Sequence, residues 1–213
     1  MERKLAAILA VDVVGYSRLM GADEEGTLER LKSLRADLFD PKVAEHHGRI
    51  VKTTGDGALV EFASAVDAVR CAVEVQREIA HYDTAAPENQ QLLLRNGINV
   101  GDIIIEGDDI YGDGVNVASR LEGLAKPGGI SISRTVFDHV ETKLDLGFDY
   151  QGEQRVKNIA QPIAVYGVLF DGQPPEITPS AETYGVTPFR VFGAVAVVAL
   201  IAAAAWWQPW NAE

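Results

Sequence analysis

Strand-like and helix-like patterns of apolar residues alternate along the first part of the chain. Leu5 to Val14 is an apolar run of the kind found in buried strands. From about Asp23 to His47, leucines recur at helical spacing among charged residues, and Gly48 follows as a stop signal. These leucines are Leu28, Leu31, Leu34 and Leu38. The pattern predicts a first strand followed by one long amphipathic helix.

A hairpin and a second helix are expected next. Ile50 to Thr53 and Ala58 to Phe62 read as strands, and the Gly-Asp-Gly turn at 55–57 between them is a strong hairpin signal. Ser64 and Asp67 then form a capping box at the start of a helix. The apolar side of this helix is predicted to face the core and contains Val66, Val69, Ala72, Val73 and Ile79.

The remaining elements complete the pattern of an α+β fold. Gly101-Asp102 is expected to interrupt an apolar stretch and divide it into two strands. We expect strands at Leu92–Val100, Ile103–Ile105 and Ile163–Phe170, a helix near Gly114–Leu124, and short elements within Ile130–Val140. The resulting order, βαββαβ with later additions, predicts helices covering one face of a mainly antiparallel sheet.

The C-terminal part of the chain has a different character. Residues 171–188 are rich in proline and small polar residues and are predicted to form a linker after a domain at 1–170. Residues 189–207 carry no charge except Arg190 and nearly match a hydrocarbon core of ~30 Å, which predicts a transmembrane helix before a short tail at 208–213. The lack of Lys or Arg beyond the span predicts a single-pass protein of the cell (inner) membrane, with the domain in the cytoplasm. An Ala-rich buried helix is the alternative.

Composition excludes several functional classes. The net charge of −12 disfavours non-specific binding of nucleic acid, since the surface as a whole repels phosphate, so no nucleic-acid partner is expected. The single cysteine, Cys71, excludes an internal disulfide, and its place in a helical pattern predicts a buried, apolar role. The four histidines show no metal-ligand spacing and no order typical of a nucleophilic triad.

Two aspartates stand at the ends of predicted strands. Asp12 closes the first apolar run, and Asp56 lies at the tip of the predicted hairpin. Carboxylates on neighbouring strand ends can hold one or two divalent cations and so support phosphoryl chemistry. The alternative is that each acid serves only its turn, since Asp before Gly is common in hairpins.

A second polar group lies on the predicted helix near 114–124. Asn116 and Arg120 are four residues apart and therefore share a face, which would suit a sugar oxygen and a phosphate. We expect Val117, Leu121 and Leu124 to form the neighbouring buried stripe. The alternative is a solvated polar face with an Arg–Glu pair.

These residues together resemble a known family. Asp12 in its strand, Lys52-Thr-Thr-Gly-Asp56, and the stretch from Asp109 to Glu122 resemble the motifs of the class III nucleotidyl cyclase catalytic domain, in the family's order and spacing. The resemblance covers roughly Arg3 to Phe170. It implies a ferredoxin-like βαββαβ sandwich with extra C-terminal strands, the nucleotide cyclase fold.

The resemblance implies roles for the two acids and for a base-reading pair. Asp12 and Asp56 match the acids that hold two Mg²⁺ or Mn²⁺ ions per active site. Lys52 and Asp109 match the donor and acceptor that read the N1 and N6 edge of adenine, so ATP is expected as substrate rather than GTP. The implied activity is that of an adenylate cyclase, which forms 3′,5′-cyclic AMP and pyrophosphate.

The resemblance also implies an active site shared between subunits. Asn116 matches the residue that orients the ribose, Arg120 the one that stabilises charge on the transferred phosphoryl group, and Lys157 a phosphate-contacting lysine. In this family the metal acids come from one subunit and the other groups from its partner, so a homodimer is expected. Only Ile103 to Asp108 stands where many relatives carry a longer arm around the partner.

Alternative functions would require other sequence features. A cyclase-like module that only binds nucleotide or dimerises would lack a metal acid or Arg120, and a guanylate cyclase would carry a different base-reading pair. A Walker-type ATPase would need Gly-x-x-x-x-Gly-Lys-Ser/Thr, and a diguanylate cyclase its Gly-Gly-acid-acid-Phe signature; neither sequence occurs.

Overall fold

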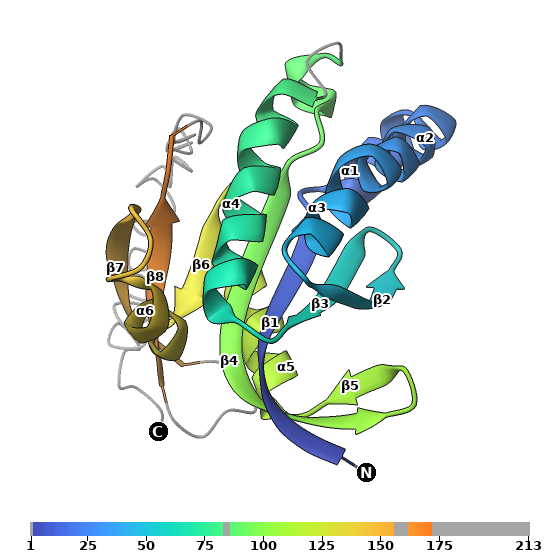
Figure 1. The fold of residues 1–213 in the computed structure, drawn as a ribbon. Coiled ribbons are helices and arrows are strands. Elements are labelled where there is room, and N and C mark those ends of the chain that lie inside the picture. Colours follow the sequence, from blue (N-terminus) through green and yellow to red (C-terminus); the bar gives the residue numbers. More distant parts are fainter. Residues whose placement is uncertain (1, 83–85, 156–161, 172–213) are drawn as a thin grey trace, which may run out of the picture. The chain divides into compact units, whose positions relative to one another are not determined.

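The computed structural model describes residues 2–82, 86–155 and 162–171, which all lie in the first of two units of the chain, Met1–Pro175 (Figure 1). Its elements are β1 (Glu2–Val13), α1 (Tyr16–Ala22), α2 (Glu24–Leu34), the π turn η1 (Arg35–Phe39), α3 (Asp40–Glu45), β2 (Arg49–Thr54), β3 (Gly57–Phe62), α4 (Ala65–Tyr82), the short 3-10 helix η2 (Glu88–Gln90), β4 (Leu94–Glu106), β5 (Asp109–Tyr111), α5 (Asp113–Leu124), β6 (Ile130–Ser133), α6 (Arg134–Val140), β7 (Gly147–Gln154) and β8 (Ile163–Leu169). The predicted linker, the predicted membrane helix and Lys157 lie outside the described residues. No helix in the described ranges is long and apolar enough to span a bilayer.

The strands form one mixed sheet of eight strands. The order is β2-β3-β1-β4-β6-β8-β7, and the short β5 pairs with β4. β1 is antiparallel to both β3 and β4, whereas β4 and β6 are parallel. The predicted α+β class is confirmed, and most of the strand pairs are antiparallel as expected.

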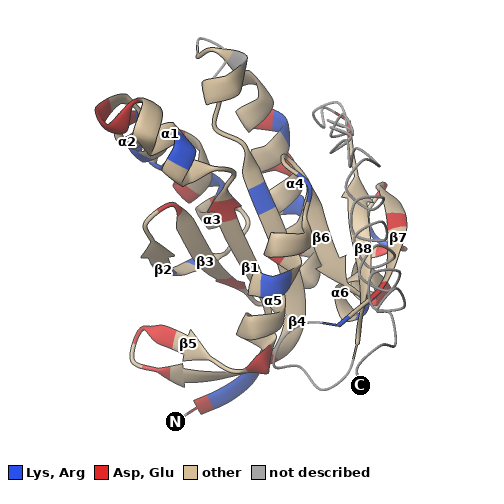
Figure 2. Ribbon diagram, turned by 180° about the vertical axis from the view of Figure 1, so that it is seen from behind, with Lys and Arg blue, Asp and Glu red and all other residues tan. Residues whose placement is uncertain are grey.

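Both faces of the sheet are covered, so the prediction of helices on one face only is wrong. Along β1, Ala7, Leu9 and Val11 face a large core that includes residues of α1 to α4 and α6. The alternate residues Ala6, Ile8 and Ala10 face a second core that includes Ala118 of α5. Figure 2 shows α5 in front of the sheet, on the side opposite α4. The sequence of Ala6 to Val11 gives the physical reason, because a strand buried on both faces has apolar residues at every position rather than at alternate ones.

Strand β4 is continuous, so the predicted break at Gly101-Asp102 is also wrong. Gly101 and Asp102 pair with Ala6 and Leu5 of β1 as ordinary strand residues. A Cβ atom on Gly97 would lie 2.1 Å from the backbone nitrogen of Glu122, and one on Gly101 would lie 3.0 Å from the Cα of Gly114. The glycines therefore allow α5 to pack directly on the strand backbone, which is a function of strand glycines other than ending a strand.

The long helix predicted over Asp23–His47 is divided in the structure. Helix α2 continues into η1, where the backbone N–H of Asp40 donates to the carbonyl of Arg35, five residues earlier, and α3 follows. This widened turn ends two residues before Pro41, which has no N–H to donate. The wider turn rotates the residues that follow it about the helix axis. The residues on the core side of the segment are Leu31, Leu34, Leu38, Phe39 and Val43, whereas Leu28 is 38 % exposed.

The hairpin β2–β3 and the helix α4 agree with their predictions. The turn between the strands is at Gly55 and Asp56, and the Ser64 hydroxyl accepts a hydrogen bond from the N–H of Asp67 at 3.3 Å. Cys71 is fully buried on α4, and burial raises the pKa of its thiol to about 12. The thiol is therefore protonated and serves as a small apolar core group, as predicted.

Candidate active site

The two predicted metal-binding acids are neighbours in the structure. Val11 pairs with Ala58, which places the end of β1 with Asp12 beside the hairpin turn that carries Asp56. Burial raises the pKa of Asp56, and the adjacent Asp12 carboxylate raises it further, against the opposing effects of a backbone hydrogen bond and Arg95. Two carboxylates held close together in a partly buried place repel each other, and a cation between them would relieve this repulsion.

Arg95 and Glu122 join these acids and were not identified from the sequence. Arg95 lies opposite Asp12 on β4, and its Nη2 is 2.8 Å from Asp12 Oδ2, while its Nε is 3.1 Å from Glu122 Oε1 on α5. Burial raises the pKa of Glu122 despite the nearby guanidinium. Arg95 therefore orients the Asp12 carboxylate and partly balances three acids. An arginine within the apolar sequence around Leu92 to Ile98 was the only local sign of this role.

The acid pair fits a divalent cation that takes further ligands from a substrate. Within the described ranges, no group of three or more acidic, histidine or cysteine side chains is arranged to hold a metal ion. Asp12 and Asp56 offer hard carboxylate oxygens, which Mg²⁺ and Mn²⁺ prefer. Mg²⁺ is commonly held by one or two carboxylates together with substrate phosphates, so two acids suffice for such a site.

Lys52 and Asp109 are brought together across the sequence, as predicted. The Nζ of Lys52 on β2 is 3.0 and 2.9 Å from the two carboxylate oxygens of Asp109 on β5. Lys52 and a backbone N–H donated by Ile110 lower the pKa of Asp109. The pair thus presents an ionised acceptor beside a fixed donor.

Asn116 and Arg120 share a face of α5, but that face points away from the sheet. Gly114, Ala118 and Leu121 are buried against the sheet, whereas Asn116 and Arg120 are exposed. Neither side chain forms a hydrogen bond or ion pair with another described residue. The predicted buried stripe is correct only for Leu121, since Val117 is half-buried and Leu124 is 41 % exposed.

Comparison with known proteins identifies the family. The sequence model of the adenylate and guanylate cyclase catalytic domain matches residues 2–169. The chain belongs to this family. The cyclase domain therefore comprises nearly all of the described residues, and domains of this family generally use divalent metal ions.

Individual relatives are consistent with this assignment. "Putative adenylate cyclase 3" of Rhizobium meliloti (strain 1021) is 42 % identical over 199 residues, which are 89 % of this chain and 34 % of the relative. An adenylate cyclase of Streptomyces coelicolor is 36 % identical over 136 residues, or 62 % of this chain and 33 % of the relative. The chain thus spans about a third of the length of these curated relatives.

A solved structure also resembles the cyclase domain closely. The crystal structure of an adenylate/guanylate cyclase/hydrolase from Silicibacter pomeroyi has a TM-score of 0.74 and 45 % identity, and the match covers 80 % of this chain and 99 % of the other. The nucleotide cyclase fold is confirmed by this similarity.

Proposed function

We propose that this cyclase domain is an adenylate cyclase, which converts ATP to 3′,5′-cyclic AMP and pyrophosphate. The observation that carries the proposal is the Lys52–Asp109 pair, in which a donor and an acceptor are held within 3.0 Å of each other. A donor for N1 and an acceptor for the N6 amine match the edge of adenine, whereas guanine presents the opposite pattern at these two positions. Names of relatives such as the Streptomyces coelicolor enzyme support the same choice.

The proposed roles of Asp12 and Asp56 are to hold two Mg²⁺ or Mn²⁺ ions per site. Such ions would supply polarisation of the 3′-hydroxyl and neutralisation of phosphate charge. The chain contributes the two carboxylates on strand ends, with Arg95 orienting Asp12. The raised pKa of Asp56 supports this role, because the closely spaced acids are unfavourable without a cation.

The outward direction of Asn116 and Arg120 supports a homodimer with shared sites. Both side chains are exposed on α5 and are available to a second copy of the chain. In the proposed dimer, Asn116 orients the ribose and Arg120 stabilises phosphoryl charge in the site whose acids belong to the partner. Two identical chains would then form two active sites.

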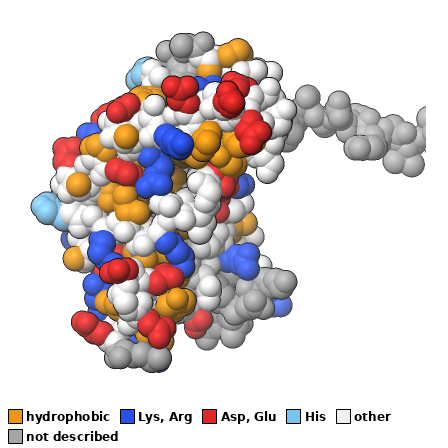
Figure 3. Space-filling model, turned by 90° about the vertical axis from the view of Figure 1, so that its right-hand side faces the viewer, with side chains coloured by type: hydrophobic (Ala, Val, Ile, Leu, Met, Phe, Trp, Pro, Cys, Tyr) orange, Lys and Arg blue, Asp and Glu red, His pale blue; other side chains and the backbone are white. Residues whose placement is uncertain are grey.

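The surface supports access for an anionic substrate despite the net charge of −12. Figure 3 shows the face on the right of Figure 1, where basic side chains are interspersed with acidic and apolar ones. The charge on this face is therefore mixed rather than uniformly negative.

Three further features remain part of the proposal on sequence grounds alone. Lys157 is proposed to contact phosphate, residues 189–207 to anchor the chain in the cell membrane, and the cyclase domain to lie in the cytoplasm. Lys157 and residues 189–207 lie outside the described ranges. The role of Lys157 is supported by the family resemblance, and the membrane anchor and the cytoplasmic placement by the apolar sequence and the position of Arg190.

The proposed activity is tested by incubating the purified chain with ATP or GTP and with Mg²⁺ or Mn²⁺, followed by product identification by mass spectrometry. We expect cyclic AMP and pyrophosphate, with ATP strongly preferred. Mainly cyclic GMP would contradict the choice of base. Nucleotide binding without any cyclic product, at concentrations where the chain is dimeric, would instead indicate a binding module.

A further inference from the structure

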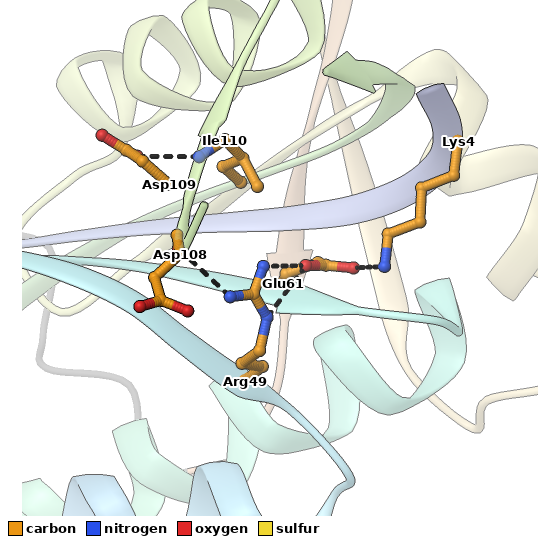
Figure 4. Close-up of polar contacts among 6 residues, drawn as sticks. All are labelled: Lys4, Arg49, Glu61, Asp108, Asp109 and Ile110. Carbon is orange, nitrogen blue, oxygen red and sulfur yellow. Dashed lines mark hydrogen bonds and ion pairs between the residues drawn. The ribbon is translucent and has the colours of Figure 1, made fainter. Parts of the chain in front are cut away.

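A buried glutamate on β3 connects two cations of the neighbouring strands. Glu61 is only 6 % exposed, and its carboxylate receives Lys4 of β1 on one oxygen and Arg49 of β2 on the other (Figure 4). Arg49 donates to Oε2 from both Nε, at 3.2 Å, and Nη2, at 2.7 Å. Burial by itself would raise the pKa of Glu61, but the two cations outweigh it and hold the pKa low. Glu61 is thus an ionised anchor that fixes the plane of the guanidinium.

Arg49 has one further contact, and it leads to the proposed base-reading strand. Its Nη1 donates to the backbone oxygen of Asp108 at 3.1 Å. Asp108 lies in the turn between β4 and β5 and directly precedes Asp109 (Figure 4). One planar guanidinium therefore contacts the buried Glu61 and the peptide next to Asp109 at the same time.

A bulge in β2 brings Arg49 and Lys52 to the same face of the sheet. In a regular strand, residues three apart point to opposite faces. Here the register shifts between Ile50 and Lys52, so that Arg49 pairs with Glu61 and Lys52 with Leu59. Leu59 belongs to the core on the α5 side, and Glu61 is two residues along the same strand. The extra residue thus directs both cations toward β5, one to the Asp108 backbone and one to the Asp109 side chain.

Strand β5 depends on contacts from other elements to fix its position, because few backbone pairings hold it. It is three residues long, pairs only with β4 in this sheet, and follows a turn in which Gly107 has a φ of +62°. Ile110 is buried in the smaller core and holds the middle of the strand. The first residue, Asp109, is half-buried and depends on the turn for its position.

We propose that Arg49, held by Glu61, is a positioning residue for base selection: it fixes the turn before β5 so that the Asp109 carboxylate stands ready beside Lys52. The inference rests on the proposed adenylate cyclase function and deepens it. Arg49 does not contact the base; it acts through Asp109. A lysine could not replace it, since a single ammonium lacks the fork that serves Glu61 and the Asp108 carbonyl together.

The test compares Arg49→Met with Lys4→Met in the full chain. Both variants remove one cation from Glu61, but only Arg49 contacts the turn before Asp109. We expect Arg49→Met to lower the ratio of kcat/KM for ATP to that for GTP by about tenfold, since an acceptor out of place leaves the adenine amine without its partner. Lys4→Met should leave this ratio within about twofold of the wild type, even where it lowers the melting temperature. Equal ratios in the two variants would overturn the inference.

A second measurement does not depend on catalysis. Hydrogen exchange of residues 107–111 should be faster in Arg49→Met than in Lys4→Met, because only the former frees the turn. If Arg49→Met does not fold, Arg49→Lys replaces it, with the same expectation for exchange and for the ratio. A wild-type chain that forms no cyclic nucleotide overturns the proposed function, and unchanged exchange at 107–111 overturns the positioning role separately.

Discussion

Asp56 is placed to bind a metal ion, but its ionised carboxylate lowers the stability of the folded chain. It sits between Gly55, with a φ of +64°, and Gly57, at the tip of the β2–β3 hairpin, where an aspartate suits the turn. Its carboxylate, however, is partly buried beside Asp12, so its pKa is raised. A raised pKa in the folded state means that the ionised form is disfavoured there, and folding is less stable above the usual aspartate range than below it.

We predict that Asp56→Asn raises the melting temperature at pH 7 in the presence of a chelator. The gain should shrink as the pH falls through the raised pKa of the wild-type Asp56 carboxyl, because the wild-type group then becomes protonated in the folded state. Mg²⁺ or Mn²⁺ should stabilise the wild type but not the variant, and cyclase activity should fall on the order of 10³-fold or more. Calorimetry measures the melting temperatures with and without metal, and product assays measure the cyclase activity. Asp149→Asn, on the exposed part of β7, is the matched control. It should leave the melting temperature, the stabilisation by metal and the cyclase activity unchanged. Metal-induced stabilisation of Asp56→Asn equal to that of the wild type would remove Asp56 from the metal site.

Helix α5 and strand β4 work as a unit, because the helix carries Asn116 and Arg120 and the strand carries Arg95. The helix approaches so closely that a Cβ atom on Gly97 would lie 2.2 Å from the carbonyl oxygen of Ala118. Such a distance requires movement of the backbone itself. The exposed face of α5 would then shift relative to the sheet.

We predict that Gly97→Ala destabilises the domain by about 1–3 kcal/mol and lowers activity more than tenfold, since overpacking displaces α5. Gly123→Ala is the control on the same helix, because nothing lies within 4 Å of its added Cβ. That variant should gain about 0.5–1 kcal/mol, as expected for Gly to Ala within a helix, and keep its activity. Denaturant unfolding and initial rates measure both effects. Equal stability of the two variants would show that the close approach of α5 does not matter.

The molecule as a whole presents its proposed catalytic groups in two directions. Asp12 lies at the end of β1 and Asp56 at the tip of the β2–β3 hairpin, whereas Asn116 and Arg120 are exposed on the outer face of α5. In the proposed homodimer, Asp12 and Asp56 of one chain would meet the base-reading pair, Asn116 and Arg120 of a second copy.

We predict that Asp56→Ala and Arg120→Ala are each inactive alone but restore activity when mixed. A mixed dimer has one site with both lesions and one with neither. Random pairing makes about half of the dimers mixed, so activity should approach about a quarter of the wild-type value. The assay is cyclic AMP formation against the mixing ratio. If both variants fold and exchange subunits but every mixture stays inactive, the groups are not divided between chains.

Local patterns predicted the elements that place most of the site. The Gly-Asp-Gly turn identified the hairpin, Ser64 the start of α4, and the 114–124 periodicity the helix α5. Strand β7 was not predicted, because much of it is polar and exposed and it has no clean alternation. Helix α1 and the three-residue β5 were also missed, since such short elements carry little periodic signal.

The sequence by itself determined the chemistry that this protein has available. Asp12 and Asp56 stand out at the ends of predicted strands, and the family resemblance of short motifs identified Lys52 and Asp109 as a pair. Only the tertiary structure decided which distant groups serve them. Arg95 meets Asp12 across 83 residues, and Arg49 meets Asp108 across 59. The first contact depends on the register of β1 and β4, and the second on the bulge in β2. Register is set by the pairing and burial of whole strands, and no single segment contains that information.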